Sequence, residues 1–422
     1  MGWPRGQVRI GGSAAALEAP GRPAIPYPRS VRRYLLPLAL LACDRGAPAP
    51  AGRPAPVMPA ESPPVVADPV ITPTPIAVPT VLVTPPSGRT SNLKTDEEAR
   101  VFPAVGRRDG EFWAVRVHAW VYEPEEDSSG RAAAIEALRK ALELPSDAPE
   151  AAIFRTRARS FLVDNESGKS LLVRIGGQEH ELASTLLDGH SHTDLRVPVA
   201  SVGAGTTGLV AIDVIPREND LRSFAGVALL LADTGTSVIS DIDDTVKISE
   251  VRDKKKLLAR TFLQEFEPVA GIADAYRRWA AAGAAFHYVS ASPWQLYDPI
   301  DGFFKREQFP QGSLHLKQFR WKDSSFLALF QDPVSYKQPL IGGLLKQFPQ
   351  RRFVLVGDSG EQDPEVYGAV YREFRAQVVA IHIRDVTQED REAPRYKAAF
   401  ADVPADRWTI FTDAATLPAS LP

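Results

Sequence analysis

Residues 237–422 alternate short apolar runs with helical patterns, and this rhythm constrains the fold more than any other feature of the chain. The runs TSVIS, AAFHYVS, RRFVLVG and AQVVAIHI are rich in strand-forming residues, and amphipathic segments separate them. Apolar strands that alternate with helices are typical of a parallel sheet covered on both faces. We therefore expect an α/β domain over 237–422, with its chemistry beyond the carboxyl ends of the strands.

Residues 98–236 follow a different pattern of short alternating runs divided by Gly, Asp, Asn and Ser. This pattern predicts strands in segments such as FWAVRVHAWVYEP, RTRARSFLVDN, KSLLVRIGG and GLVAIDVIP, with one helix at RAAAIEALRKALEL. We expect a smaller antiparallel, sandwich-like domain without chemistry of its own. The SGKS stretch at 167–170 is not a phosphate-binding loop, because Val163 stands where that loop requires a glycine.

The N-terminal region contains an apolar run that ends at the only cysteine. In VRRYLLPLALLAC, residues 31–43, two arginines precede a run far shorter than the roughly 20 residues that span a bilayer. The stretch resembles a bacterial lipoprotein signal, with Val31 as the true start and lipid on Cys43. A short buried helix with a structural cysteine is the alternative. The resemblance implies a lipid-anchored protein on the periplasmic side of the cell envelope, or a cytoplasmic one if residues 1–43 are not processed.

The chain has 37 prolines, and residues 44–97 are the richest in them. Proline at such density excludes helices and central strands, so this segment is expected to be an extended, disordered linker. Lys and Arg number 49 against 52 Asp and Glu, a balance that argues against a nucleic-acid partner. A single cysteine excludes an intrachain disulfide and a cysteine-based zinc site.

Polar residues follow the predicted strands of the α/β domain. Asp241 comes after SVIS, Ser290 after FHYV and Asp358 after FVLVG, while Lys337 opens one helix and Asp363 the next. Each residue alone has an ordinary explanation as a turn, cap or surface residue. Because the carboxyl ends of parallel strands meet at one edge, we expect all five side chains to converge there.

This combination of residue types suits phosphoryl transfer. A phosphate dianion repels a carboxylate, so the site needs cations: Mg²⁺ on oxygens of Asp241, Asp358 and the Asp243 backbone, and the ammonium of Lys337. Asp241 would attack phosphorus to form an aspartyl-phosphate. Asp243 would serve as acid and base if neighbouring carboxylates raise its pKa. Ser290 would donate to phosphoryl oxygens, and Thr245 would brace the loop through backbone hydrogen bonds.

The motifs resemble those of the haloacid dehalogenase (HAD) superfamily of phosphatases. More narrowly, several stretches over about 237–415 are similar to the catalytic domain of the actin-patch type phosphatidate phosphatases and their bacterial relatives: SDIDDTVKIS, YVSASPWQLYDPIDGFF, FPQGSLHLKQF, YKQPLIGGLLKQFP and VLVGDSGEQDPEVY. Glu361 stands where that family is expected to have Gln.

The resemblance implies a role for each matching residue. Asp241 and Asp243 are the catalytic pair, and the phosphate-binding residues are Ser290, Lys337 and Thr245. The metal-site residues are Asp241, Asp243, Asp358 and Asp363, and Asp244 remains as a loop-shaping residue.

The stretch from Ala291 to Tyr336 is too short for a large cap, which favours an open site and a bulky or surface-bound substrate. Aromatic residues in this part of the chain either contact a lipid interface or build the local core: Trp294, Tyr297, Phe303, Phe304, Phe309 and Trp321. We expect a Mg²⁺-dependent phosphatase that converts phosphatidate, or a related lipid phosphate, to diacylglycerol and phosphate at a membrane surface. The alternatives are a phosphatase for a non-lipid envelope phosphomonoester and a catalytically idle binding protein.

Overall fold

The computed structural model describes residues 88–124, 129–148, 152–203, 207–319 and 333–422. The predicted leader with Cys43 and the predicted linker up to residue 87 lie outside these ranges. The described residues belong to one compact unit, Thr74–Pro422. Residues that precede the first strand also pack against this unit: Leu93 is fully buried, and Ser91 N donates to Ile215 O at 2.9 Å.

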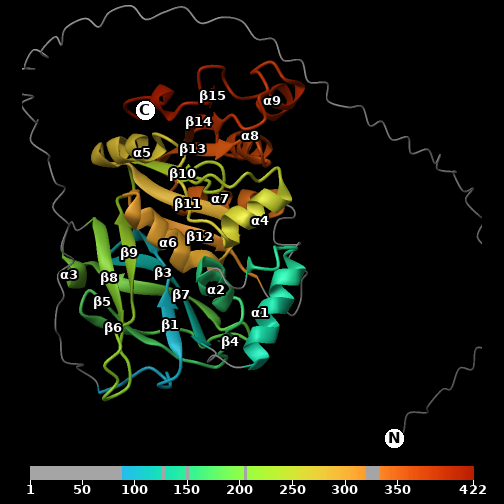
Figure 1. Ribbon diagram of the computed structural model, residues 1–422. Helices are drawn as coiled ribbons and strands as arrows, with labels where there is room; N and C mark the ends of the chain where they lie inside the picture. Colours follow the sequence, from blue (N-terminus) through green and yellow to red (C-terminus); the bar gives the residue numbers. More distant parts are fainter. Residues whose placement is uncertain (1–87, 125–128, 149–151, 204–206, 320–332) are drawn as a thin grey trace, which may run out of the picture. The chain divides into compact units, whose positions relative to one another are not determined.

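A six-stranded parallel sheet forms the second half of the chain (Figure 1). Its strands are β10 (Thr236–Ser240), β11 (Ala285–Pro293), β12 (Gly312–Lys317), β13 (Arg352–Asp358), β14 (Val378–Arg384) and β15 (Trp408–Phe411), in the order β12-β11-β10-β13-β14-β15. Counted within this domain, the order is 3-2-1-4-5-6, so the topology reverses between β10 and β13. In sheets of this kind ligands bind outside the carboxyl ends of the strands at that reversal.

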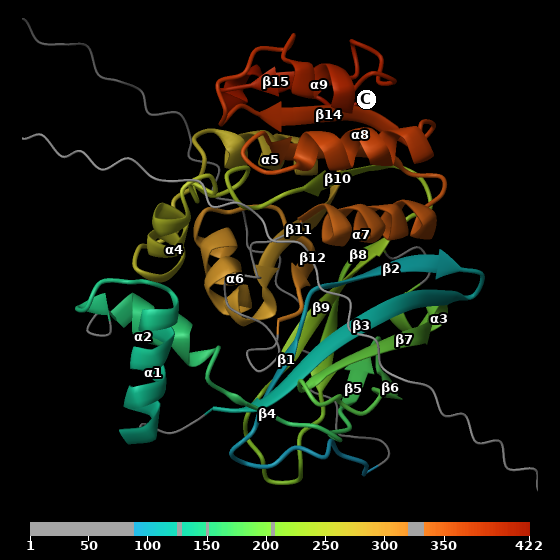
Figure 2. The same cartoon turned by 90° about the vertical axis from the view of Figure 1, so that its right-hand side faces the viewer.

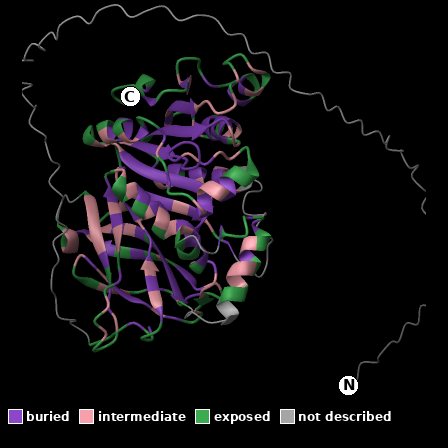
Figure 3. Ribbon diagram, viewed as in Figure 1, coloured by how far each residue is buried: buried purple, intermediate pink, exposed green. Residues whose placement is uncertain are grey.

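Helices cover both faces of the parallel sheet. Successive strand residues point to opposite faces, so Val238 and Val354 belong to one buried cluster, and Ile239 and Leu355 to another. The first cluster includes side chains of α4 (Lys254–Phe262), α5 (Ile272–Ala281), η2 (Trp294–Leu296) and α6 (Tyr297–Arg306). The second includes side chains of α7 (Pro333–Gln347), α8 (Asp363–Glu373) and α9 (Pro394–Ala399). The predicted two-sided α/β architecture is confirmed, and Figure 3 shows its strands largely buried.

The preceding domain is one nine-stranded, mostly antiparallel sheet. Its strands are β1 (Glu98–Val101), β2 (Ala104–Asp109), β3 (Phe112–Glu123), β4 (Asp164–Asn165), β5 (Leu172–Ile175), β6 (Gln178–Glu181), β7 (His190–Pro198), β8 (Gly208–Val214) and β9 (Ala225–Leu231). β2 and β9 form a parallel pair. Alternate residues of β3, such as Val115 and Val117, share a buried cluster with Val173 of β5 and Ile212 of β8. The sheet therefore curls around one core, as expected of a sandwich-like domain.

One predicted strand is a helix. Residues 155–165 were expected to be extended, but α2 (Ala152–Arg159) occupies the start of that stretch, after the predicted helix α1 (Ser129–Ala141). The buried residues Phe154, Arg157 and Ala158 follow helical spacing. The Arg157 guanidinium donates to Thr261 O at 2.6 Å, which explains why a charged residue is buried there. The prediction was wrong because this tertiary contact cannot be read from local alternation.

The antiparallel domain packs against the edge of the parallel sheet at β12 (Figure 2). Phe102, between β1 and β2, has its ring centroid 4.2 Å from that of Trp294, and Leu314 N donates to Pro103 O at 3.4 Å. Arg100 Nε lies 3.1 Å from Asp298 Oδ1 across the same contact. Among the described helices, none combines the length and apolar character that crossing a bilayer requires.

Candidate active site

Asp241 lies directly beyond the carboxyl end of β10, at the topological reversal. Its backbone N–H donates to Val356 O of β13 at 2.9 Å, which ties the residue to both strands. A tight turn follows, in which Val246 N and Lys247 N both donate to Ile242 O. The side chain of Asp241 is 1% exposed. The sequence thus places a carboxylate where the fold itself leaves space for a ligand.

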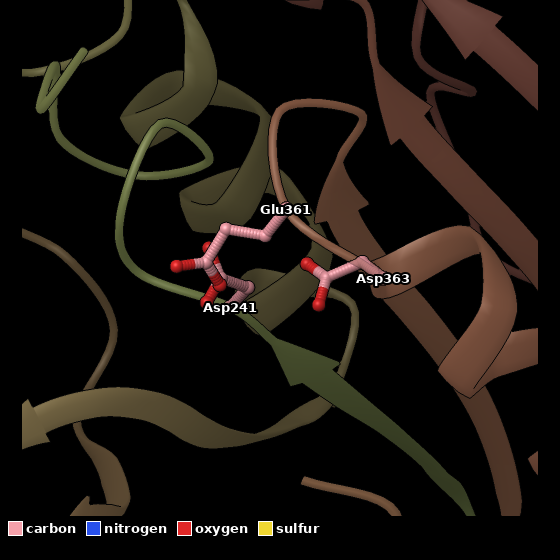
Figure 4. Close-up of side chains that lie close together, drawn as sticks. All are labelled: Asp241, Glu361 and Asp363. Carbon is pink, nitrogen blue, oxygen red and sulfur yellow. The ribbon is translucent and has the colours of Figure 1, made fainter. Parts of the chain in front are cut away.

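Lys337, in α7, connects three carboxylates. Its Nζ lies 2.8 Å from Asp241 Oδ1, 2.7 Å from Asp363 Oδ1 and 2.9 Å from Glu361 Oε2. Oxygens of the three carboxyl groups lie within 4.8 Å of one another. Figure 4 shows the three carboxyl side chains close together, Asp241 from the end of β10 and Glu361 and Asp363 from the segment where β13 leads into α8. Sequence reasoning predicted that Lys337, Asp241 and Asp363 would meet, and noted Glu361 only as a departure from the family pattern.

Asp363 and Asp358 belong to the loop between β13 and α8. Asp363 begins α8, followed by Pro364 in the first turn. Its Oδ2 accepts a hydrogen bond from Asp358 N at 3.2 Å, while Asp358 Oδ1 accepts from Gly360 N at 2.6 Å and Glu361 N at 3.1 Å. A Cβ on Gly357 would lie 2.3 Å from Asp363 Oδ2, so only glycine permits this close approach.

The cluster carries more negative than positive charge. Burial raises the pKa of Asp241, and Asp363 and Glu361 raise it further, while Lys337 opposes the shift. Burial and the neighbouring carboxylates likewise raise the pKa of Asp358. The pKa of Lys337 is raised because the surrounding carboxylates outweigh its burial. The ammonium of Lys337 therefore balances only part of the negative charge that the four carboxyl groups would carry when ionised. These groups belong to Asp241, Asp358, Glu361 and Asp363.

Two buried oxygens in this cluster have no hydrogen-bond partner. They are Asp241 Oδ2 and Asp358 Oδ2, both on residues predicted to hold a metal. A buried carboxylate oxygen without a donor is costly, and a hard divalent cation is a ligand that would satisfy it. The residues present therefore fit a Mg²⁺ ion, with Asp241 and Asp358 as the residues that would hold it and Asp363 beside them.

Asp243 is the centre of a second hydrogen-bonded group. Lys247 Nζ and Ser249 Oγ donate to its Oδ1, the latter at 2.8 Å. Ser290 Oγ and Ser292 Oγ donate to its Oδ2, at 2.8 and 3.0 Å. The predicted phosphate-binding Ser290 thus lies in the site, but its hydroxyl is directed to Asp243.

The expectation for the proton affinity of Asp243 was wrong. Burial opposes its ionisation, but the charge and hydrogen bond of Lys247, with the hydroxyl groups of Ser249 and Ser290, lower its pKa below the ordinary value. Sequence reasoning overlooked Lys247 and Ser292. Lys247 stands two residues after Thr245 in an apolar context, and Ser292 stands two after Ser290. Their closeness in sequence to predicted site residues could have indicated that both belong to the site.

Thr245 and Asp244 shape the loop in different ways. Thr245 is fully buried, and its Oγ1 has no hydrogen-bond partner, so it does not brace the loop as expected. Asp244 has φ of 55°, and its carboxylate accepts from the N–H groups of Ser249, Glu250 and Val251 at 2.7 to 3.0 Å. Asp244 therefore has the loop-shaping role that was predicted for it.

Most of the aromatic residues near the site belong to the core. Among the six candidates for lipid contact, Trp294, Phe303 and Phe309 are buried, and Tyr297 and Phe304 pack against the same cluster. Trp321 lies outside the described residues. The core interpretation therefore holds for the five described residues.

The fold and the carboxylate cluster around Lys337 together match one class of phosphatase. A parallel sheet in the order 3-2-1-4-5-6, with a carboxylate after its first strand and a lysine and two aspartates from later segments beside it, is the arrangement implied by the HAD phosphatase motifs.

Comparison with known proteins shows what the second half of the chain is similar to. Residues 236–385 match the family model for the catalytic domain of phosphatidate phosphatase APP1. Phosphatidate phosphatase APP1 of Saccharomyces cerevisiae is 32% identical over 168 residues, which cover 38% of this chain and 28% of the yeast protein. An uncharacterized protein of Schizosaccharomyces pombe is 29% identical over 212 residues, or 49% of this chain and 34% of that protein. The resemblance expected from the sequence motifs is confirmed for this segment.

The matched regions cover only about a third of these relatives, 34% and 28% of their lengths. A solved structure of a Pnkp1/Rnl/Hen1 complex aligns with a TM-score of 0.25 and 18% identity over 38% of this chain and 50% of that chain. This likeness is too low to support an argument.

Proposed function

We propose that this protein is a Mg²⁺-dependent phosphatase that hydrolyses phosphatidate or a related lipid phosphate to diacylglycerol and inorganic phosphate. The observation that carries the proposal is the position of Asp241, which lies at the end of β10 with Lys337 Nζ 2.8 Å from its Oδ1. The match of residues 236–385 to the APP1 catalytic domain supports the lipid phosphate as substrate.

In the first step, a carboxylate oxygen of Asp241 attacks phosphorus and the bond from phosphorus to the ester oxygen breaks. Asp243, which is ionised in the free protein because its contacts lower its pKa, first takes a proton from the singly protonated phosphate group of the substrate. It passes this proton to the leaving alkoxide, and the phosphoryl group remains on Asp241. Lys337 holds Asp241 in place and offsets the charge of the phosphoryl oxygens. Bound Mg²⁺ would neutralise further negative charge at the phosphoryl group.

In the second step, Asp243 as a carboxylate takes a proton from water, and the water oxygen attacks phosphorus. The bond from phosphorus to Asp241 breaks, and the departing phosphate takes the proton from Asp243, so both residues return to their ionised states. The contacts of Asp243 with Lys247 and Ser249 favour the ionised form that this step requires. Ser290 and Ser292 keep that carboxylate directed toward the reaction centre.

The test compares the wild type with Asp241→Asn on a soluble aryl phosphate and on phosphatidate micelles, with and without Mg²⁺. We expect the wild type to hydrolyse both substrates only with Mg²⁺, and the variant to lose at least about 1,000-fold in kcat, as other enzymes do without their nucleophile. Hydrolysis of the aryl phosphate alone would indicate a non-lipid phosphomonoester. Hydrolysis of neither would leave a binding protein, and full activity of the variant would exclude Asp241 as nucleophile.

We also propose that the protein is anchored to the cell envelope through lipid on Cys43. The support is the signal-like stretch that precedes this cysteine. An anchored enzyme would meet lipid phosphates at a membrane surface. Mass spectrometry of the mature N-terminus tests this: lipidated Cys43 is expected, and an unmodified Cys43 within an intact chain would contradict the proposal.

A further inference from the structure

A hollow separates α7 from the antiparallel domain. Its volume is about 480 Å³, and its walls come from α7, from β12 and the residues after it, and from the β1–β3 and β7 region of the other domain. We call it the α7 hollow. A second cavity of about 650 Å³ shares Arg116, Gly343 and Gln347 with it, so the space continues along α7.

Two residues that line the α7 hollow are close in sequence to residues of the candidate active site. Tyr336 lines it, and the next residue is Lys337, whose Nζ contacts Asp241. Trp294 also lines it and follows Ser292, which donates to Asp243, by two residues. The same segments that position the catalytic carboxylates therefore form the near wall of the hollow.

The lining of the α7 hollow is mainly apolar. Its walls include Phe102, Val105, Leu314, Leu316, Leu340 and Leu344. Burial lowers the pKa of His118 well below its ordinary value and that of His315 to about 4, so both imidazoles are neutral at pH 7. No Asp or Glu lines it. The exposed cationic side chains are paired with carboxylates: Arg116 lies 2.8 Å from Asp194, which lines the adjoining cavity, and Lys346, also in that cavity, lies 2.9 Å from Glu373.

We propose that the α7 hollow binds an acyl chain of the lipid phosphate whose phosphate group is cleaved at Asp241. This inference rests on the proposed function. An apolar chain gains free energy when it leaves water for such a lining, at about 25 cal/mol per Å² of buried area. The volume falls within the range of roughly 300 to 1,000 Å³ that is typical of small-molecule sites. A soluble phosphomonoester would leave the hollow unused.

Gly343 provides a selective test. It lies on the exposed side of α7, lines both cavities, and a Cβ built on it meets nothing within 4 Å. Gly343→Trp would therefore place a large side chain at the wall of the hollow from a position where its Cβ meets no protein atom, and Gly343→Ala would add only a methyl group. Gly302 in α6 is a matched control, because it is also an exposed helical glycine with open space at its Cβ but lines neither cavity.

The experiment measures kcat/KM of the full chain for dioleoyl phosphatidate in mixed micelles and for an aryl phosphate. We expect Gly343→Trp to lose at least about tenfold on the lipid while the aryl phosphate rate stays within twofold. Gly343→Ala and Gly302→Trp should resemble the wild type on both substrates. Equal losses on both substrates, or an unchanged lipid rate in Gly343→Trp, would overturn the inference. A wild type inactive on phosphatidate but active on aryl phosphate would instead refute the proposed lipid substrate.

A binding measurement does not depend on turnover. Asp241→Asn, incubated with phosphatidate that carries a photoreactive group in one acyl chain, should cross-link within residues 314–318 or 336–347. Adding Gly343→Trp should reduce this labelling at least about fivefold. Labelling confined to other segments, or unaffected by Gly343→Trp, would show that the chain binds elsewhere.

Discussion

Lys247 Nζ donates a hydrogen bond to Asp243 Oδ1 inside a loop where both side chains are buried. The ring of Phe266 covers the ammonium, with 4.8 Å between Nζ and the ring centroid. The proton that Asp243 transfers in the proposed reaction is therefore controlled by a lysine only four positions away. This pair explains why the pKa of Asp243 is lowered in a site otherwise crowded with carboxylates.

Replacing Lys247 should leave Asp243 as a buried charge without a cation. We expect Lys247→Met to lower the free energy of unfolding by about 3 to 5 kcal/mol, and Lys247→Met combined with Asp243→Asn to lower it by less, because the second change removes the unpaired charge. Urea denaturation of the wild type, Lys247→Met, Asp243→Asn and the double variant measures the coupling between the two residues. Lys256→Met is the control, since its ion pair with Glu250 is exposed to solvent and should contribute little to stability. Strictly additive losses would show that the two residues are not coupled.

Asp244 should stabilise the loop through its carboxylate rather than through its backbone conformation. Asp244→Gly tolerates the positive φ of 55° but leaves three N–H groups without their acceptor, so we expect a loss of about 2 to 3 kcal/mol in unfolding free energy. Asp244→Asn keeps one acceptor oxygen and should lose less. Denaturation curves compare them, and equal stabilities of the Gly and Asn variants would assign the effect to φ alone.

The strand rhythm and the residues after each strand were sufficient to predict the parallel sheet and the meeting of Asp241, Lys337 and Asp363. That prediction works because parallel strands end at a common edge. The partners of Asp243 were not predicted, because the position of a residue after a strand does not determine which group its side chain contacts: Ser290 was expected to donate to phosphate but donates to Asp243, and Lys247 and Ser292 were overlooked. The helix α2 was missed because Arg157 is buried by a distant segment, through the carbonyls of Thr261 and Gln264 and the ring of Phe266.

Glu361 and Asp358 should differ in their importance for the metal. Asp358 Oδ2 has no hydrogen-bond donor, whereas Glu361 Oε2 accepts from Lys337. We expect Asp358→Asn to raise the Mg²⁺ concentration for half-maximal aryl phosphate hydrolysis at least about tenfold, and Glu361→Gln to change it by less than about threefold. Activity measured against Mg²⁺ concentration tests this. A larger effect in Glu361→Gln would place the ion among Asp241, Glu361 and Asp363, whose oxygens also lie close together.

Buried histidines should make the fold sensitive to mild acid. Burial lowers the pKa of His382 to about 4, and its Nδ1 lies 2.8 Å from Thr409 Oγ1. Between that value and the unfolded pKa of about 6.5, the unfolded chain binds a proton that the folded chain does not, so stability falls as pH decreases through this window. Each such histidine contributes about 1.4 kcal/mol per pH unit, and burial lowers the pKa of His190 and His315 to about 4 as well.

His382→Gln isolates one of these contributions. Its amide can still bond to Thr409 but cannot titrate, so the decrease in unfolding free energy between pH 6.5 and 5 should be smaller than in the wild type by up to about 2 kcal/mol. Above pH 7 the histidine is neutral in both states, and the difference between the two proteins should be constant. Urea denaturation at half-unit pH intervals measures both ranges. If the unfolding free energies of the wild type and His382→Gln fell in parallel down to pH 5, the folded protein would accept the proton at His382. Burial would then impose no cost on the charged form of this histidine.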